Sequence, residues 1–214
     1  MDPEFETYLE ERKNRLLAWL RTVVSDERIV DAFRKVPRTV FVPRAFAAEA
    51  WTDRALPLGE GQTISQPSMI AMMLDALAPE PDDRALEIGA GCGYAAALLA
   101  NLVREVHGVE IRPTLAEMAK ECLARAGVSN VTIHLGDGSR GLPEHAPYDC
   151  ILVSAGATRI PEPIVLELAP GGRIAIPVGD DEDQLLKVGR RPLDGGDVVW
   201  TTSVHCIFVP LLGA

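Results

Sequence analysis

The chain has 214 residues, of which 47% are hydrophobic and 24% are charged, so it is long enough to bury one substantial core. Its 31 acidic residues outnumber its 21 basic residues, which gives a formal net charge of -10, and no basic cluster offsets this excess. Such a balance argues against binding to nucleic acid or to an anionic membrane. The sequence therefore predicts a single domain over residues 1–214, with no nucleic-acid partner and no membrane partner.

The cysteines and the N-terminus bear on the cellular compartment. The four cysteines have neither C-x-x-C spacing nor the density of a secreted disulfide scaffold. The N-terminus lacks the basic-then-apolar order of a signal peptide, and no apolar stretch is long enough to span a bilayer. We therefore expect a cytoplasmic protein. Residues 1–5 resemble a cloning remnant and are left out of the fold prediction.

The first part of the chain predicts helices followed by irregular segments. In residues 6–24, apolar side chains recur at spacings near three and four among charged ones, as an amphipathic helix requires. Ser25 is an acceptable N-cap for a second helix that ends near Lys35. Prolines and glycines then predict extended segments and loops up to a helix over residues 68–77. Residues 6–80 thus form a mainly helical N-terminal part.

From residue 84 onward, apolar strands alternate with helices, which is typical of βαβ units and a parallel sheet. The expected strands are 85–88, 106–109, 131–135, 150–153 and 173–176, and the expected helices are 94–102, 114–126 and 162–168. Glycine and proline residues at 170–172 are expected to end the last helix. Residues 185–188 and 198–208 flank a turn-rich stretch and predict an antiparallel hairpin. The fold class is therefore α/β, with a doubly wound, mostly parallel, Rossmann-like core over residues 81–214.

A glycine-rich segment lies between the first strand and the first helix of this core. Gly89, Gly91 and Gly93 free the backbone of side chains at the carboxyl end of the strand, where a doubly wound sheet binds nucleotides. Tyr94 stands where a dinucleotide fingerprint would place its third glycine, which weakens an NAD interpretation. For the loop alone, a tight turn without any ligand remains an alternative.

Two carboxylates follow the next predicted strands. Glu110 ends the second strand, about twenty residues beyond the loop, where a carboxylate can accept hydrogen bonds from ribose hydroxyls. Asp137, which precedes Gly138, follows the third strand and can accept a hydrogen bond from an adenine amino group. Alone, Glu110 could be a solvated charge and Asp137 a turn residue. Their joint placement favours a nucleotide site, and S-adenosylmethionine (AdoMet) suits it because AdoMet has no pyrophosphate to be cradled.

Residues 59–67, with the sequence GEGQTISQP, resemble the signature of the protein-L-isoaspartate O-methyltransferase family. The resemblance covers nearly the whole chain, and its specific part is residues 61–67, because many methyltransferases share the glycine loop. It implies a seven-stranded AdoMet-dependent methyltransferase sheet with an N-terminal helical addition. The chain departs from the family pattern at Cys92, at Glu167 and in ending three residues after Leu211. We expect the two substitutions to leave the reaction intact.

The resemblance also implies roles for the residues that match its motifs. Ser65 corresponds to the active-site hydroxyl, and Thr63 and Ile64 to residues that line the cofactor. The segment that holds Val209 and Leu211 corresponds to the one whose backbone helps to hold the substrate carboxylate. The expected cofactor-binding set is Thr63, Ile64, Gly89, Ala90, Gly91, Gly93, Glu110, Asp137 and Gly138.

The implied reaction is transfer of a methyl group from AdoMet to the free carboxylate of L-isoaspartyl residues in damaged proteins. An α-carboxyl group with a pKa of roughly 3.5 is already ionised at neutral pH, so the reaction needs no general base. The expected partners are isoaspartyl-containing proteins and peptides, and the family leans towards monomers. Two alternatives stay open: a carboxyl methyltransferase with another peptide or small-molecule acceptor, and a non-catalytic AdoMet-binding protein.

The histidines do not form a recognisable metal motif. His107, His134, His145 and His205 are scattered along the chain without close spacing, so we expect each to be structural or exposed. The acidic run at residues 180–183 lacks the glycine and the distal glutamate of a calcium loop. The sequence therefore predicts no metal site.

Overall fold

The structure is a computed structural model that describes residues 3–213. Its α-helices are α1 (Pro3–Leu20), α2 (Glu27–Lys35), α3 (Pro67–Leu77), α4 (Tyr94–Leu99), α5 (Pro113–Arg125) and α6 (Glu162–Leu166). Its strands are β1 (Leu56–Gly59), β2 (Gln62–Ile64), β3 (Arg84–Ile88), β4 (Glu105–Glu110), β5 (Val131–Leu135), β6 (Tyr148–Val153), β7 (Leu168–Gly179), β8 (Gln184–Arg190) and β9 (Val199–Cys206). None of the helices described is long and apolar enough to cross a membrane.

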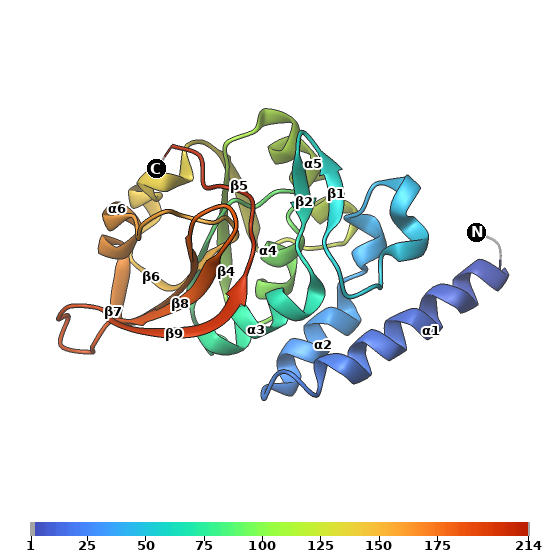
Figure 1. Ribbon diagram of the computed structural model, residues 1–214, viewed down its shortest axis with the longest axis horizontal. Helices are drawn as coiled ribbons and strands as arrows, with labels where there is room; N and C mark the ends of the chain where they lie inside the picture. The colour runs from blue at the N-terminus through green and yellow to red at the C-terminus, as the bar shows by residue number, and fades with distance from the viewer. Residues whose placement is uncertain (1–2, 214) are drawn as a thin grey trace.

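The strands form one large sheet and one small one. The large sheet has seven strands in the order β5-β4-β3-β6-β7-β8-β9, and β1 pairs with β2 in a separate antiparallel sheet (Figure 1). Strands β3 to β7 pair in parallel, whereas β8 is antiparallel to both β7 and β9. The predicted α/β fold, with a mostly parallel sheet and antiparallel strands at its end, is confirmed.

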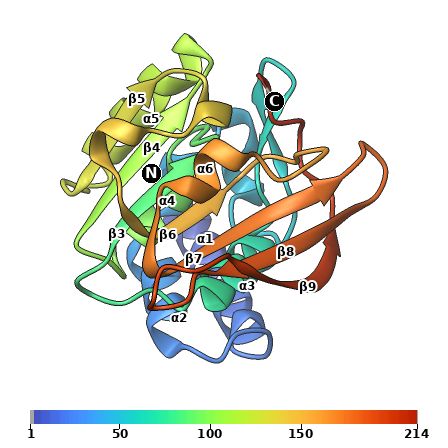
Figure 2. The same ribbon diagram turned by 90° about the vertical axis from the view of Figure 1, so that its left-hand side faces the viewer.

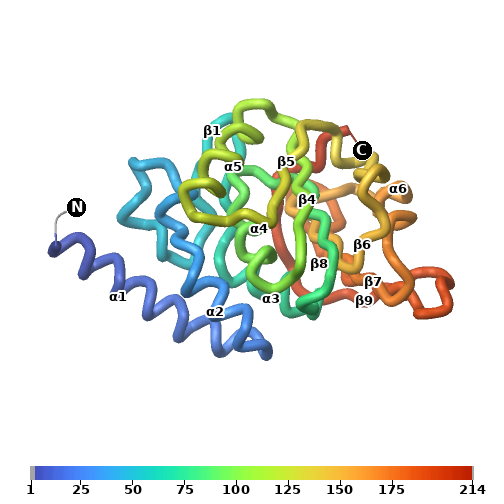
Figure 3. Tube along the Cα trace, turned by 180° about the vertical axis from the view of Figure 1, so that it is seen from behind, coloured from blue at the N-terminus to red at the C-terminus, as the bar shows by residue number. Residues whose placement is uncertain are grey.

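Alternating residues of the large sheet face two apolar layers. Ala85 belongs to a cluster that includes buried residues of α1 to α5, whereas the next residue, Leu86, packs on the opposite side with Ile164 of α6. Figure 2 shows α6 in front of the sheet, and Figure 3, which views the molecule from behind Figure 1, shows α4 and α5. Such two-sided cover explains why the central strands are mostly apolar rather than alternating.

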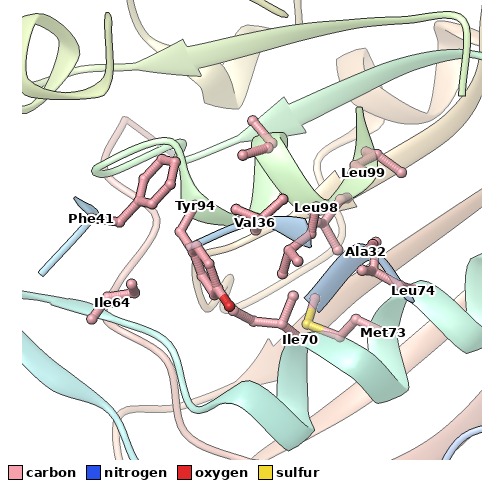
Figure 4. Close-up of a cluster of buried hydrophobic side chains, with 14 of the residues drawn as sticks. Ala32, Val36, Phe41, Ile64, Ile70, Met73, Leu74, Tyr94, Leu98 and Leu99 are labelled. Carbon is pink, nitrogen blue, oxygen red and sulfur yellow. The ribbon is translucent and has the colours of Figure 1, made fainter. Parts of the chain in front are cut away.

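The N-terminal part shares its core with the sheet. Figure 4 shows Phe41 and Ile64 beside Tyr94 of α4, and all three are buried. The rings of Phe41 and Tyr94 lie 5.3 Å apart between their centroids. This shared core supports the expectation of a single domain. Of the expected cloning remnant, residues 3–5 continue α1, whereas residues 1–2 lie outside the described residues.

Two local predictions are wrong for physical reasons. Ser25 does not cap α2, because Asp26 accepts the backbone N–H of Arg28, while Ser25 donates its own backbone N–H and hydroxyl to Asp75 of α3. The glycine and proline residues at 170–172 do not form a loop after a helix. They lie within β7, which begins at Leu168 and shifts its register against β6.

Residues 37–67 are more regular than the sequence predicts. Two 3-10 helices, Arg38–Val40 and Arg44–Glu49, precede the β1–β2 hairpin. The turn of this hairpin holds Gly59, Glu60 and Gly61, all at positive φ. Strands of three or four residues carry too little periodicity to be recognised from the sequence. The hairpin matters because β2 leads directly into the segment that holds Ser65.

Candidate functional site

The glycine loop makes a sharp turn between β3 and α4. Gly89, Gly91 and Gly93 have φ values of +79°, +55° and +81°, which a residue with a Cβ adopts only with strain. The N–H groups of Gly89 and Ala90 both donate to the carbonyl of Val109, at 2.9 and 3.1 Å, which fixes the loop to β4. The loop is thus held against the carboxyl end of the neighbouring strand.

Glu110 connects this loop to the chain after β4. Its side chain is buried, and its two carboxylate oxygens accept the backbone N–H groups of Gly91 at 2.8 Å and Arg112 at 2.9 Å. Each carboxylate oxygen can accept more than one hydrogen bond, so capacity remains for the hydroxyls of a ligand. Glu110 therefore shapes the loop and still faces the cavity beside it.

Three adjoining cavities lie at the carboxyl end of the sheet. We call them the loop cavity, beside Glu110, the inner cavity, beneath the glycine loop, and the hairpin cavity, beside Ser65 and the segment after β9. Thr63 and Ser154 line all three, so the cavities meet at these two side chains. This arrangement can hold two ligands side by side.

Most of the site residues that the sequence predicts lie in these walls. Predicted residues of the loop cavity are Thr63, Gly89, Gly91, Glu110, Gly138, Val209 and Leu211. Ile64 and Ala90 line the inner cavity, and Ser65, which is half-buried, lines both the inner and the hairpin cavity. Gly93 lies outside all three, where an added Cβ would approach Ala119 and Leu123 of α5 to 3.3 Å. Its lack of a side chain serves helix packing.

Asp137 is also outside the cavity walls. Its carboxylate accepts the backbone N–H of Ser139 at 3.0 Å and the hydroxyl of Ser139 at 2.7 Å, so it caps the 3-10 turn Gly138–Arg140. Gly213 lies directly against the same carboxylate, because a Cβ added there would clash with it. Of the two predicted residues Asp137 and Gly138, only Gly138 lines the loop cavity.

Glu87 is a site residue that sequence reasoning missed. It lies in β3, is only 1% exposed and lines the inner cavity. One carboxylate oxygen accepts the hydroxyl of Ser154 at 2.8 Å, and the other has no partner among the described residues. Burial raises the pKa of Glu87 to about 8, although the Ser154 hydrogen bond opposes the rise. A positively charged ligand group at this free oxygen would favour the ionised form of Glu87, so the position suits such a group.

Ile111 is a second cavity residue that sequence reasoning missed. It lines the loop cavity and is 39% exposed directly after buried Glu110. A signal was available, because this large apolar residue directly follows the end of a predicted strand, where a doubly wound sheet binds its ligand. Ser154 gave no comparable signal, because a serine after a strand is common in turns.

Hydrogen bonds fix the C-terminal segment across the cavities. Gly156 donates its N–H to the carbonyl of Val209 at 2.9 Å, and its carbonyl accepts the N–H of Leu211 at 2.7 Å. Buried Gln184 binds both the N–H and the carbonyl of Phe208, at 2.8 and 3.1 Å. Figure 1 shows this red segment running from β9 towards the carboxyl ends of the parallel strands. Val209 therefore lines both the loop cavity and the hairpin cavity.

The two substituted family positions are both buried, and Cys92 lies in the wall of the inner cavity. Burial raises the pKa of Cys92 to about 12, so its side chain is an uncharged thiol at neutral pH. Glu167 accepts the backbone N–H of Leu142 at 2.9 Å and lines none of the three cavities. Neither residue offers a reactive group to the site.

Comparison with known proteins gives a consistent result. The family model of protein-L-isoaspartate(D-aspartate) O-methyltransferase (PCMT) matches residues 11–214. The protein-L-isoaspartate O-methyltransferase of Roseiflexus castenholzii is 47% identical over 207 residues, which cover 96% of this chain and 94% of the relative. The Methanoculleus marisnigri protein of the same name is 47% identical over 191 residues, which cover 89% of this chain and 86% of that relative.

Solved structures agree with these sequence matches. A structure of a protein-L-isoaspartate O-methyltransferase superposes with a TM-score of 0.85 at 30% identity, over 94% of this chain and 66% of its own. A Plasmodium falciparum structure, described as a beta-aspartate methyltransferase in complex with S-adenosyl-L-homocysteine, superposes with a TM-score of 0.78 at 25% identity. The match covers 92% of this chain and 96% of that structure's chain. The chain thus belongs to the protein-L-isoaspartate(D-aspartate) O-methyltransferase (PCMT) family.

Proposed function

We propose that this chain transfers a methyl group from AdoMet to the free carboxylate of L-isoaspartyl residues in damaged proteins. The products are a methyl ester and S-adenosylhomocysteine. The observation that carries the proposal is the meeting of the cavities at Thr63 and Ser154, because a methyl donor and a carboxylate acceptor must be held next to each other. The names of the relatives support the same donor and acceptor.

The residues of the loop and inner cavities fit AdoMet. When bound, AdoMet supplies a methyl group on a positively charged sulfur. Glu110 would accept hydrogen bonds from the ribose hydroxyls, and Ile111 would cover the adenine ring. The unpartnered oxygen of buried Glu87 suits the ammonium group of the methionine part. Asp137 would act through its turn, by holding Gly138 in the cavity wall.

The hairpin cavity would hold the acceptor carboxylate. The Ser65 hydroxyl would donate a hydrogen bond that orients this carboxylate, and Val209 and Leu211 would form the adjoining wall. An ionised carboxylate needs no general base, so alignment and exclusion of water provide the catalysis. The C-terminal segment covers the place where the two ligands would meet.

The wider setting follows from the same proposal. The partners would be isoaspartyl-containing proteins and peptides, and the net charge of -10 disfavours nucleic acid. A cytoplasmic monomer fits a repair enzyme that must reach many different proteins. Size-exclusion chromatography with light scattering would test the monomer directly, and a dimer mass would contradict it.

One assay separates the proposed function from its alternatives. The protein is incubated with methyl-labelled AdoMet and two matched peptides, one with L-isoaspartate and one with L-aspartate at the same position. We expect base-labile ester on the isoaspartyl peptide alone. If neither peptide is labelled although AdoMet binds, the repair function is wrong, and other carboxylate acceptors or a non-catalytic role become the next candidates.

A further inference from the structure

Three histidines that are far apart in the sequence lie together in the structure. His107 is on β4, His134 is on the neighbouring edge strand β5, and His145 ends the 3-10 turn Pro143–His145. Their ligand atoms all lie within 4.8 Å of one another. The three histidines are scattered along the sequence, but strand pairing and the turn before β6 bring them together. The fourth, His205, is exposed beside Asp183.

The spacing of the nitrogen atoms fits a shared ion. Nδ1 of His107 lies 3.1 Å from Nε2 of His134. Two nitrogens that bind one tetrahedral zinc ion at about 2.0–2.1 Å are themselves about 3.3 Å apart. His145 is half-buried in a short turn, and its ring, which stacks on that of His107, would have to rotate for its nitrogen to become the third ligand.

A carboxylate lies near the second ring nitrogen of His107. Its Nε2 is 4.0 Å from a carboxylate oxygen of Glu105, beyond hydrogen-bond distance but close enough for a hydrogen bond after a small shift of either side chain. Arg84 donates to Glu105 at 2.8 Å and to the carbonyl of His145 at 3.1 Å, so it steadies both groups. Metal-binding histidines generally have a carboxylate or carbonyl at the second ring nitrogen, where it fixes the ring orientation.

The ligand type also suits such an ion. Imidazole nitrogen is a usual ligand of zinc, copper and nickel ions. Of the charged groups near His107, Glu105 is negative and Arg84 is positive, and these two are paired with each other.

We propose that His107, His134 and His145 form a binding site for a divalent zinc ion, with the fourth position left to water. The site lies outside the three cavities, and the ion would join β4, β5 and the turn before β6. Within residues 3–213, no other group of histidine, cysteine and acidic side chains is placed to hold an ion. The ion stabilises the edge of the sheet and takes no part in methyl transfer.

A purely structural cluster is the competing explanation. In that case His107 and His134 share a direct hydrogen bond, and the rings of His107 and His145 stack with their centroids 4.2 Å apart. Such a cluster would show no preference for zinc over calcium or magnesium. The two explanations therefore differ in a measurable way.

The test is a metal titration of the full chain without any histidine tag, after removal of metal by a chelator. We expect one equivalent of Zn²⁺ to bind in calorimetry and to raise the melting temperature. Co²⁺ should give the visible absorption bands of a tetrahedral site, and Zn²⁺ should abolish them. His134→Gln and His145→Gln should each weaken zinc binding by at least about tenfold, because each removes one ligand.

Exposed His205 provides the matched control, since His205→Gln should bind zinc as the unmodified chain does. His107 is left intact, because replacing a buried side chain also changes packing. The proposal is overturned if the unmodified chain binds zinc no more tightly than a variant with both His134→Gln and His145→Gln. S-adenosylhomocysteine affinity, measured in every variant, should stay constant, which separates this site from the methyltransferase function.

Discussion

Ser65 has a hydroxyl group that borders both the inner cavity and the hairpin cavity, as do Thr63 and Ser154. If it orients the acceptor carboxylate, Ser65→Ala should lower kcat by roughly tenfold, the loss expected for one hydrogen bond. Cofactor affinity should stay the same. Steady-state kinetics with the isoaspartyl peptide provide the measurement, and Ser203→Ala, on the exposed face of β9, is the control. Equal kcat in both variants would remove Ser65 from the mechanism.

Glu110 combines two tasks, since it binds the backbone of the loop and faces the cavity. Glu110→Gln places an amide NH₂ where one backbone N–H now donates, so the loop loses a hydrogen bond to a charged group. We expect S-adenosylhomocysteine affinity to fall by about 1.5–3 kcal/mol, which calorimetry can measure. Glu117→Gln, on the exposed surface of α5, should change nothing. Full affinity in Glu110→Gln would show that the cofactor does not depend on this carboxylate.

Glu87 gives the free energy of unfolding a specific pH dependence. Its folded pKa of about 8 lies above the ordinary value of 4.5, because burial disfavours the charged form. Between these two values the folded chain holds an extra proton, so this group makes stability decrease as pH rises through that window. Urea denaturation between pH 5 and 8 should show a smaller decrease in Glu87→Gln than in the unmodified chain. Parallel curves would mean that Glu87 is ionised in the folded protein at neutral pH.

At the scale of elements, α2 and α3 are joined by a carboxylate. Asp75 of α3 accepts the backbone N–H groups of Ser25 and Asp26, at 3.1 and 3.2 Å, where α2 begins. Asp75→Ala leaves both groups without this partner and should lower the free energy of unfolding by roughly 1–2 kcal/mol. The urea midpoint measures the loss. Asp31→Ala, at a half-buried position of α2, serves as the control and should cost less than Asp75→Ala.

The elements also show what a sequence reveals. The strands of the core were predictable, because apolar runs such as residues 85–88 stand between clear turn signals. The Ser25 cap was wrong because the adjacent Asp26 caps α2, while Ser25 binds Asp75 of another helix, which the local sequence does not show. The histidine cluster likewise depends on contacts distant in sequence, such as the pairing of β4 with β5. Glu87 was not recognised as a site residue, because a single charged residue within an apolar strand does not show which side chain it will contact in the fold.

At the scale of the whole molecule, the shared core predicts cooperative unfolding. Trp51 lies in the N-terminal part and is 6% exposed, whereas Trp200 lies in β9. Each can be kept as the sole fluorophore by changing the other two tryptophans to phenylalanine. In both variants, the fluorescence transition in urea should coincide with the circular-dichroism transition of the same variant. An earlier transition for Trp51 would show that residues 6–80 form a separate unfolding unit.

The C-terminal segment couples ligand binding in the loop cavity to ligand binding in the hairpin cavity. Val209 is a wall of the loop cavity and of the hairpin cavity, and hydrogen bonds of Gly156 and Gln184 tie the backbone of this segment to the loop after β6 and to β8. A ligand that packs on Val209 from one side restricts the remaining motion of its side chain, which spares the second ligand that ordering entropy. Peptide and cofactor should therefore bind with positive cooperativity. By thermodynamic linkage, each should raise the affinity for the other by the same factor.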